Sequence, residues 1–378
     1  MTRVVRLVAL DLPPGPKLIG EIERNWAAGT AVLPLDQRMM PGARRRLAID
    51  LGASHIVSPD GTDQIAGHES RKHAPLQADD ALVIATSGST GKPKGVVHTH
   101  ASLRAHHRMV GDRLSLASSD TWWLCLPAAH IGGFGVIARA LAYGSNLIAV
   151  DRVDDLTIAT ALSAGCTHTA VVPTHLARHD FSRWNVVLVG GSRTGPLPAN
   201  AVATYGLTET CGGVVYDGMP LPGVDVKIVA GEIHLRTASL ARAYRHEALV
   251  QKDGWFATGD LGTLEAGRLR VDGRRDDLII TGGNKVWPAV VESRLREHPL
   301  VADCAVRGVP DAEWGAVVCA FVVPKLTSHA PTLEQVRGHV KETLASYCAP
   351  RRLTLVDLIP RTSTGKVMAS ELMKLVAP

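Results

Sequence analysis

Short apolar runs alternate with amphipathic stretches through the first half of the chain, which predicts strands interleaved with helices. Residues 31–35, 54–57 and 81–85 predict strands, and residues 41–51 predict a helix that begins near Pro41. A further apolar run at 95–100 follows a polar loop, so the loop is predicted to join two strands as a hairpin. This alternation indicates an α/β core.

The pattern then changes to short strands separated by glycine turns, which predicts a small β subdomain near residues 224–272. The charged segment 272–277 is a candidate hinge, and the residues after it predict a compact α+β module. We therefore predict an α/β plus α+β fold, with an N-terminal domain at 1–274 and a small C-terminal domain at 275–378.

Composition excludes several classes of protein. A hydrophobic content of 46% and a charged content of 20% are typical of globular proteins, and a net charge of +5 suits polyanionic ligands rather than nucleic acid. The six cysteines include no Cys-x-x-Cys pair, which argues against a zinc site or a disulfide framework. No apolar run reaches the roughly 18 residues of a membrane span, and no secretory signal is evident, so we expect a cytoplasmic protein.

Candidate phosphate chemistry begins with the segment TSGSTGKPKG, from Thr86 to Gly95. Its backbone amides and hydroxyls can form an anion-binding nest. A P-loop requires Ser or Thr directly after Gly-Lys, whereas Pro93 follows Gly91-Lys92 here. The segment therefore predicts a phosphate-binding loop of another kind.

Four further polar clusters follow in the sequence: ATYGLTET at 203–210, GWFATGD at 254–260, GRRDDLIITGG at 273–283 and PRTSTGK at 360–366. Taken singly, each segment is also compatible with a purely structural role. In the same order, these roles are a turn, an Asx-turn, a charged surface turn and a solvated lysine.

Together, the five segments occur once each and in one order, and in this the sequence resembles the ATP-dependent adenylate-forming enzymes, which include acyl- and aryl-CoA synthetases, adenylation domains and luciferases. The resemblance implies ATP, Mg²⁺ and coenzyme A as cofactor and co-substrates, and a carboxylic acid as the other small-molecule partner. It implies a phosphate-binding role for a set of loop residues: Thr86, Ser87, Gly88, Ser89, Thr90, Gly91, Lys92 and Lys94.

The same resemblance assigns roles outside the loop. Tyr205 would stack on adenine, Thr208 would contact the α-phosphate and Glu209 would hold Mg²⁺. Asp260 and Arg274 would bind the ribose.

In the C-terminal part, the resemblance implies that Lys366 bridges the substrate carboxylate and the α-phosphate. Asp276 matches the hinge about which a mobile C-terminal domain turns, and Gly282-Gly283 matches the side of the coenzyme A channel.

Residues 126–139, LPAAHIGGFGVIAR, are the segment that indicates which carboxylic acid the chain binds. We expect a helix from Phe134 to Tyr143, capped by Gly144, with Arg139 on the same side as Gly135. The glycine would leave space for an anion before the arginine, although a solvated arginine is equally compatible with the pattern.

This segment resembles the o-succinylbenzoate–CoA ligases of menaquinone biosynthesis, a branch of the same family. That resemblance implies that His130 takes part in catalysis and substrate binding, and that Arg139 binds the second carboxylate.

Several alternatives stay open. The chain could be another aryl- or short-chain acyl-CoA ligase, an enzyme that passes the acyl group to an amine or a carrier protein, or a homologue without activity. The oligomeric state is open, with a homodimer as one option. Residues 192–204 are too few for a helix usual in the family at full length, and Asn284-Lys285 departs from the family pattern. The histidine cluster His98, His100, His106 and His107 lacks metal-site spacing and is interpreted as incidental.

Overall fold

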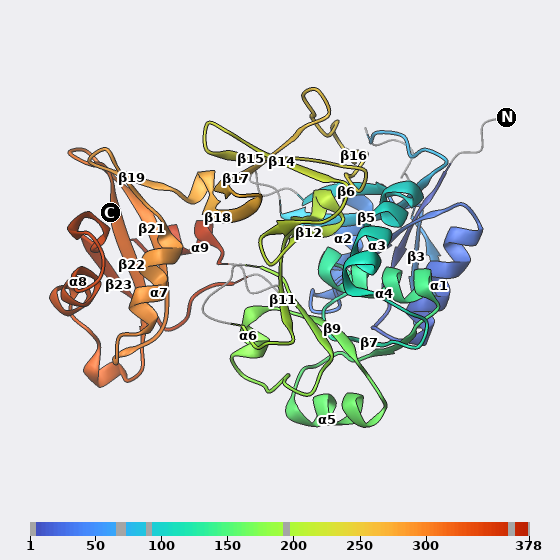
Figure 1. The fold of residues 1–378 in the computed structure, drawn as a ribbon, viewed down its shortest axis with the longest axis horizontal. Helices are drawn as coiled ribbons and strands as arrows, with labels where there is room; N and C mark the ends of the chain where they lie inside the picture. The colour runs from blue at the N-terminus through green and yellow to red at the C-terminus, as the bar shows by residue number, and fades with distance from the viewer. Residues whose placement is uncertain (1–4, 66–72, 88–92, 192–196, 362–366, 377–378) are drawn as a thin grey trace. The chain divides into compact units, whose positions relative to one another are not determined.

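The computed structural model describes residues 5–65, 73–87, 93–191, 197–361 and 367–376 (Figure 1). The chain divides into two compact units. The first comprises the residues up to Lys227 with His234–Thr258 and Leu264–Leu269. The second comprises Ile228–Ile233, Gly259–Thr263 and the residues from Arg270 onward. Among the helices in the described parts, none is long and apolar enough to span a bilayer.

The first unit contains a seven-stranded sheet of order β16-β6-β5-β2-β1-β3-β4. Its central pairs are parallel and its edge pairs are antiparallel. The continuous apolar sequence of the central strands follows from burial on both faces. The predicted hairpin is confirmed, because β5 and β6 pair antiparallel. The strands are β16 (Ala243–Tyr244), β6 (Pro93–Thr99), β5 (Asp80–Ser87), β2 (Ala31–Pro34), β1 (Leu7–Leu10), β3 (His55–Ser58) and β4 (Gly61–Gln64).

A second seven-stranded sheet of this unit has the order β13-β12-β11-β10-β9-β7-β8. It is parallel from β8 to β11 and antiparallel at β12 and β13. The strands are β7 (Thr121–Leu124), β8 (Asn146–Ala149), β9 (His168–Val171), β10 (Val186–Val189), β11 (Ala201–Leu207), β12 (Gly212–Tyr216) and β13 (Met219–Pro220). The predicted α/β core is therefore confirmed.

The helices of the first unit begin where their capping residues predict. Three start at a proline, two have a capping box, at Thr99 and Asp154, and α4 ends at Gly144 with φ of 64°. They are α1 (Pro16–Ala27), α2 (Pro41–Asp50), α3 (His100–Leu114), α4 (Ile131–Tyr143), α5 (Asp155–Ser163) and α6 (Pro173–Leu176).

The expected start of α4 at Phe134 is wrong, because the helix begins at Ile131. Its first turn includes Gly133, where a Cβ atom would lie 2.3 Å from the carbonyl oxygen of Pro127. Gly133 is thus required because the backbone of the segment before the helix packs closely against its first turn.

The predicted small β subdomain is a four-stranded sheet of order β14-β15-β17-β18. Its residues are divided between the two units. The strands are β14 (Val224–Val229), β15 (Glu232–Thr237), β17 (Phe256–Glu265) and β18 (Arg268–Arg274).

The second unit has the predicted α+β architecture, with a sheet of order β20-β19-β22-β21 and β23 parallel to β22. Valine-rich strands and two helices, α7 and α8, enclose its main core. Its elements are β19 (Ile279–Thr281), β20 (Asn284–Val286), α7 (Pro288–Arg296), β21 (Val301–Asp311), β22 (Gly315–Pro324), α8 (Leu333–Lys341), β23 (Arg352–Leu355) and α9 (Ala369–Met373).

Candidate active site

Arg139 on α4 is buried in the first unit, with only 4% of its surface exposed. Its guanidinium lies over the ring of Trp122 at 4.8 Å. A Cβ atom at Gly135 would lie 3.0 Å from Arg139 Nη1, so the space that the glycine leaves is occupied by the guanidinium itself and not, as predicted, left open for an anion. The alternative of a solvated arginine is wrong.

The charge of Arg139 has no counter-charge among the described residues. Neither a hydrogen bond nor an ion pair joins its guanidinium to the described part of the chain, and its Nε atom is fully buried. Burial lowers the pKa of Arg139, although arginine keeps its proton. Because an unpaired buried charge is costly, this site is suited to an anion.

The titratable groups that act on Arg139 are neutral. Burial raises the pKa of Cys211 and of Tyr216 to about 12. Burial lowers the pKa of His106 to about 3, and the pKa of His168 is lowered by the same cause. Arg139 is thus a buried cation in otherwise uncharged surroundings.

His130 precedes α4 as its N-cap residue and forms a cluster that the sequence did not predict. Its Nε2 lies 3.3 Å from Oδ2 of the buried Asp36 and 3.2 Å from Nη2 of Arg38. Arg38 also donates to both Asp36 oxygens at 2.9 Å. The available signal was the position of Asp36, just after the carboxyl end of the parallel strand β2, where ligand-binding residues gather in α/β sheets.

At the predicted phosphate loop, the described residues are those at its two ends. Thr86 pairs with Lys94 across the β5–β6 hairpin, and Thr86 Oγ1 donates to the Lys94 carbonyl at 3.4 Å. The Lys94 ammonium lies 2.7 Å from Glu247 and 5.0 Å from the ring centre of Tyr244. Ser87 ends strand β5. Gly88, Ser89, Thr90, Gly91, Lys92 and the predicted catalytic Lys366 lie outside the described residues.

Tyr205, Thr208 and Glu209 lie at the end of β11, which has a bulge between Tyr205 and Gly206 and continues into a 3₁₀ turn at Thr208–Thr210. The Tyr244 hydroxyl donates to Glu209 Oε1 at 2.9 Å, and Tyr244 also carries the Lys94 contact. The structure therefore brings the loop lysine and the predicted metal ligand to one tyrosine.

Glu209 is suited to Mg²⁺ by its chemistry. Its second carboxylate oxygen has no hydrogen-bond partner within the described chain, and Mg²⁺ is commonly held by one or two carboxylates together with substrate phosphates. Groups of three or more metal-ligating side chains are absent from the described residues.

His98 corrects the interpretation of the histidine cluster as incidental. Its ring is buried on β6, and Nε2 donates to the Thr208 carbonyl at 2.7 Å, while Nδ1 lies 3.3 Å from Ser102 Oγ. Burial lowers the pKa of His98 to about 4, so the ring is neutral near pH 7. His98 thereby fixes the backbone at a predicted α-phosphate contact, a role that no spacing rule would reveal.

In the second unit, Asp260 and Arg274 are brought together, with Arg274 Nη1 at 3.1 Å from Asp260 Oδ1. Asp260 is buried within β17, so the Asx-turn alternative is wrong. Next to it, Gly259 has φ of 74° and donates its N–H to Glu232, which also pairs with Arg275. An acidic and a basic side chain side by side can bind hydroxyl groups as acceptor and donor.

The predicted hinge and channel residues also lie in the second unit. Asp276 belongs to a 3₁₀ turn at Arg275–Asp277. Gly282 and Gly283 form the β19–β20 turn with φ of 53° and 78°. A Cβ atom at Gly282 would lie 2.6 Å from the Trp314 ring, whereas one at Gly283 would meet nothing within 4 Å. Only Gly283 therefore borders open space.

Residues 58–245 match the AMP-binding enzyme family, and residues 290–366 match the AMP-binding enzyme C-terminal domain. The chain belongs to the AMP-binding enzyme family. The predicted membership of the adenylate-forming enzymes is thus confirmed, and the two matches cover most of the motifs that carried the prediction.

Similar proteins extend the match along the chain. A probable 2-succinylbenzoate–CoA ligase of Mycobacterium tuberculosis (strain H37Rv) is 37% identical over 92% of this chain and 96% of its own length. A 2-succinylbenzoate–CoA ligase of Bacillus cereus is 33% identical over 81% of this chain and 73% of its own length.

Solved structures have the same fold. The o-succinylbenzoate CoA synthetase of Bacillus subtilis in complex with its acyl-adenylate intermediate has a TM-score of 0.84 and 26% identity, covering 98% of this chain and 88% of that chain. The same enzyme with ATP and a magnesium ion has a TM-score of 0.83 and 26% identity, covering 98% and 90%.

Proposed function

We propose that the chain is an ATP-dependent ligase that joins 2-succinylbenzoate to coenzyme A through an acyl-adenylate, releasing AMP and diphosphate. The observation that carries this proposal is Arg139, a buried cation without a counter-charge among the described residues. The names of the relatives, 2-succinylbenzoate–CoA ligases, support the same substrate.

In the first step, an oxygen of the succinyl carboxylate attacks the α-phosphorus of ATP, and the bond between the α- and β-phosphates breaks so that diphosphate leaves. Both reactants are anionic, so catalysis requires neutralisation and alignment. We assign Glu209 to hold Mg²⁺, which would neutralise phosphate charge. Lys366 would contact both the carboxylate and the α-phosphate, and Thr208 the α-phosphate.

In the second step, the thiolate of coenzyme A attacks the acyl carbonyl carbon, the bond from that carbon to the phosphate oxygen breaks, and AMP leaves. We assign Gly282-Gly283 to the side of the thiol channel and Asp276 to the hinge between domains 1–274 and 275–378. Tyr205, Asp260 and Arg274 are proposed to hold the adenosine, and the loop from Thr86 to Lys94 the departing phosphates. A cytoplasmic location and a homodimer belong to the same proposal.

The ring carboxylate is proposed to bind Arg139. A carboxylate next to this guanidinium would supply the missing counter-charge with charge-assisted hydrogen bonds. The Trp122 ring covers one face of the guanidinium, so the carboxylate is proposed to bind at the edge or the other face of that group. His130, positioned by Asp36, is proposed to contact the acid at the start of α4.

The test measures pyrophosphate release with ATP and Mg²⁺ for 2-succinylbenzoate, benzoate, 4-phenyl-4-oxobutyrate and octanoate, each with and without coenzyme A. We expect 2-succinylbenzoate to be preferred and turnover to require coenzyme A. Equal rates with the monocarboxylic acids would indicate another aryl- or acyl-CoA ligase. Adenylate formation without thioester would indicate an amine or carrier-protein acceptor.

A further inference from the structure

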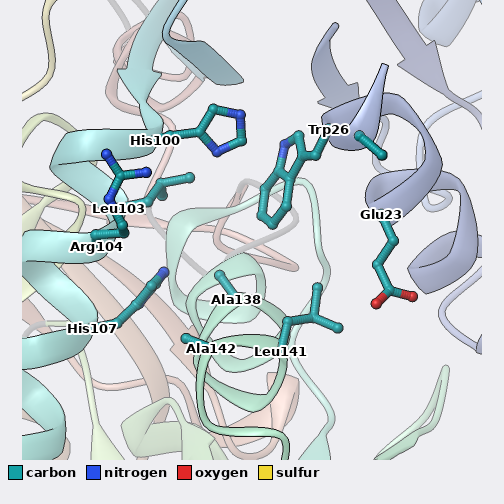
Figure 2. A pocket seen from close by; sticks show the side chains of 10 residues that line it. Glu23, Trp26, His100, Leu103, Arg104, His107, Ala138, Leu141 and Ala142 are labelled. Atoms are coloured by element: carbon teal, nitrogen blue, oxygen red, sulfur yellow. The ribbon is translucent and has the colours of Figure 1, made fainter. Parts of the chain in front are cut away.

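A pocket of about 470 Å³ lies between helices α1, α3 and α4 of the first unit (Figure 2). Neither Arg139 nor any described residue of the phosphate loop is among its lining residues, so we treat it as separate from the proposed acid site. Its volume lies in the range of small-molecule sites. The lining side chains are Glu23, Trp26, Ala27, His100, Leu103, Arg104, His107, Ala138, Leu141 and Ala142.

One end of the pocket is aromatic. The Trp26 ring meets the His100 ring edge-on at a centroid distance of 5.4 Å, and Figure 2 shows the two rings side by side. Leu103, Leu141 and small alanines form the rest of the apolar wall. Small side chains leave flat space beside Trp26, and aromatic rings favour offset or edge-on contact with another ring.

One polar side chain projects into this apolar space. His107 is 5% exposed, and its Nδ1 has no hydrogen-bond partner. Figure 2 shows the ring extending from α3 into the pocket, with a nitrogen at its tip. Burial keeps the pKa of His107 well below its usual value, so the neutral ring has one N–H donor and one acceptor. The nitrogen at the tip of the ring, unlike the fully buried Nδ1, faces the pocket and has no hydrogen-bond partner among the described residues, so it can pair with a bound group.

The rim supplies a cation. Arg104 is exposed on α3 one turn before His107, and the exposed Glu23 stands on the opposite helix α1. Figure 2 shows these two side chains on opposite sides of the pocket. An anionic group would therefore bind on the α3 side, beside Arg104 and away from Glu23.

We propose that this pocket binds a planar aromatic carboxylic acid, with its ring beside Trp26, its carboxylate on Arg104 and a hydrogen bond to His107. The site does not depend on the proposed ligase activity, because it shares no residue with the acid site at Arg139.

The test is isothermal titration calorimetry with 2-naphthoate, a two-ring probe with one carboxylate. We expect saturable binding to the wild type, and about tenfold weaker binding to His107→Phe, which keeps the ring shape but loses the hydrogen bond. Ala142→Trp fills the pocket from an exposed position, so the protein should fold and binding should be lost. Ala101→Trp, at an exposed alanine of α3 outside the pocket, is the matched control and should bind as the wild type does.

Three results would overturn the proposal. They are no binding to the wild type, equal binding to Ala142→Trp and Ala101→Trp, or loss of binding in Arg139→Met. The last result would place the probe in the acid site instead. Because binding is measured without turnover, failure of the proposed ligase activity would leave this test unaffected.

Discussion

Replacing Arg139 with methionine should stabilise the ligand-free protein while it weakens binding of the dicarboxylic acid. Methionine has a similar length and an apolar, adaptable side chain that can fill the same space beside Trp122. The substitution removes a charge that has no counter-charge among the described residues. The two effects have opposite signs, which separates a binding role from a structural one.

The expected change in the free energy of unfolding caused by Arg139→Met follows from two opposing contributions. Burying an unpaired ion costs about several kcal/mol after relaxation, and exchange of buried ionic groups for apolar ones has stabilised proteins by roughly 1–4 kcal/mol. The contact of Arg139 with Trp122 at 4.8 Å offsets about 0.5–2 kcal/mol of that cost. We therefore expect the free energy of unfolding of Arg139→Met to exceed that of the wild type by about 1–2 kcal/mol.

The assay is urea unfolding with and without 2-succinylbenzoate. At 100 times its dissociation constant, the acid should stabilise the wild type by about 2.7 kcal/mol and the variant by much less. Arg113→Met, at a half-exposed arginine paired with Asp217, is the control and should keep the full ligand effect. A variant that is less stable without ligand, yet equally stabilised by the acid, would refute a role for Arg139 in binding.

Three further predictions concern residues near the site. His98 remains neutral in the folded protein, because burial lowers its pKa to about 4, so the unfolded state binds more protons below pH 6.5. About 3 kcal/mol of the free energy of unfolding should therefore be lost as the pH falls from 6.5 to 4. His98→Gln should remove this loss, and urea unfolding at several pH values measures it. Tyr244→Phe removes the hydroxyl that donates to Glu209, so KM for ATP·Mg²⁺ should rise about three- to tenfold in steady-state kinetics. Asp36→Asn removes the carboxylate beside His130, so kcat for the acid should fall about tenfold in steady-state kinetics.

Matched substitutions at exposed positions control these three predictions. His329→Gln should leave the pH slope of stability unchanged, Tyr347→Phe should leave KM for ATP unchanged, and Asp60→Asn should leave kcat for the acid unchanged. A His98→Gln protein with the wild-type slope would assign the lost stability to other groups. A wild-type kcat in Asp36→Asn would show that the carboxylate beside His130 has no role in the reaction.

The elements of the fold were predictable wherever local pattern and burial agree. The strands at 31–34 and 80–87 are buried on both faces, so a continuous apolar run sufficed to find them. The start of α4 was not predictable from propensity, because glycines at 132 and 133 are poor helix formers. Contact with the Pro127 carbonyl, a tertiary feature, decides that Gly133 is helical.

Site residues on one segment were predictable, and partners from distant segments were not. Arg139 and Gly135 are one helical turn apart, so their shared face followed from spacing alone. Asp36 and His130 are separated by 94 positions, and His98 and Thr208 by 110. A single sequence contains no signal for such pairs, because only the packing of the sheets and of helix α4 sets their distance.

The environment of Arg139 also explains how one residue can select a dicarboxylic acid. In the ligand-free state, the guanidinium is desolvated and its neighbours Cys211, Tyr216 and His106 are neutral, so no protein group within the described chain relieves the charge. An acid with a second carboxylate relieves it, whereas a monocarboxylic acid leaves it as it was. Charge-assisted hydrogen bonds contribute about 1.5–3 kcal/mol, which predicts roughly 10- to 150-fold selectivity in kcat/KM. Because this selectivity originates in the unpaired charge, Arg139→Met should remove it chiefly by slowing 2-succinylbenzoate, with the rate for benzoate unchanged or higher. A parallel fall in both rates would instead show that Arg139 supports the catalytic geometry as a whole.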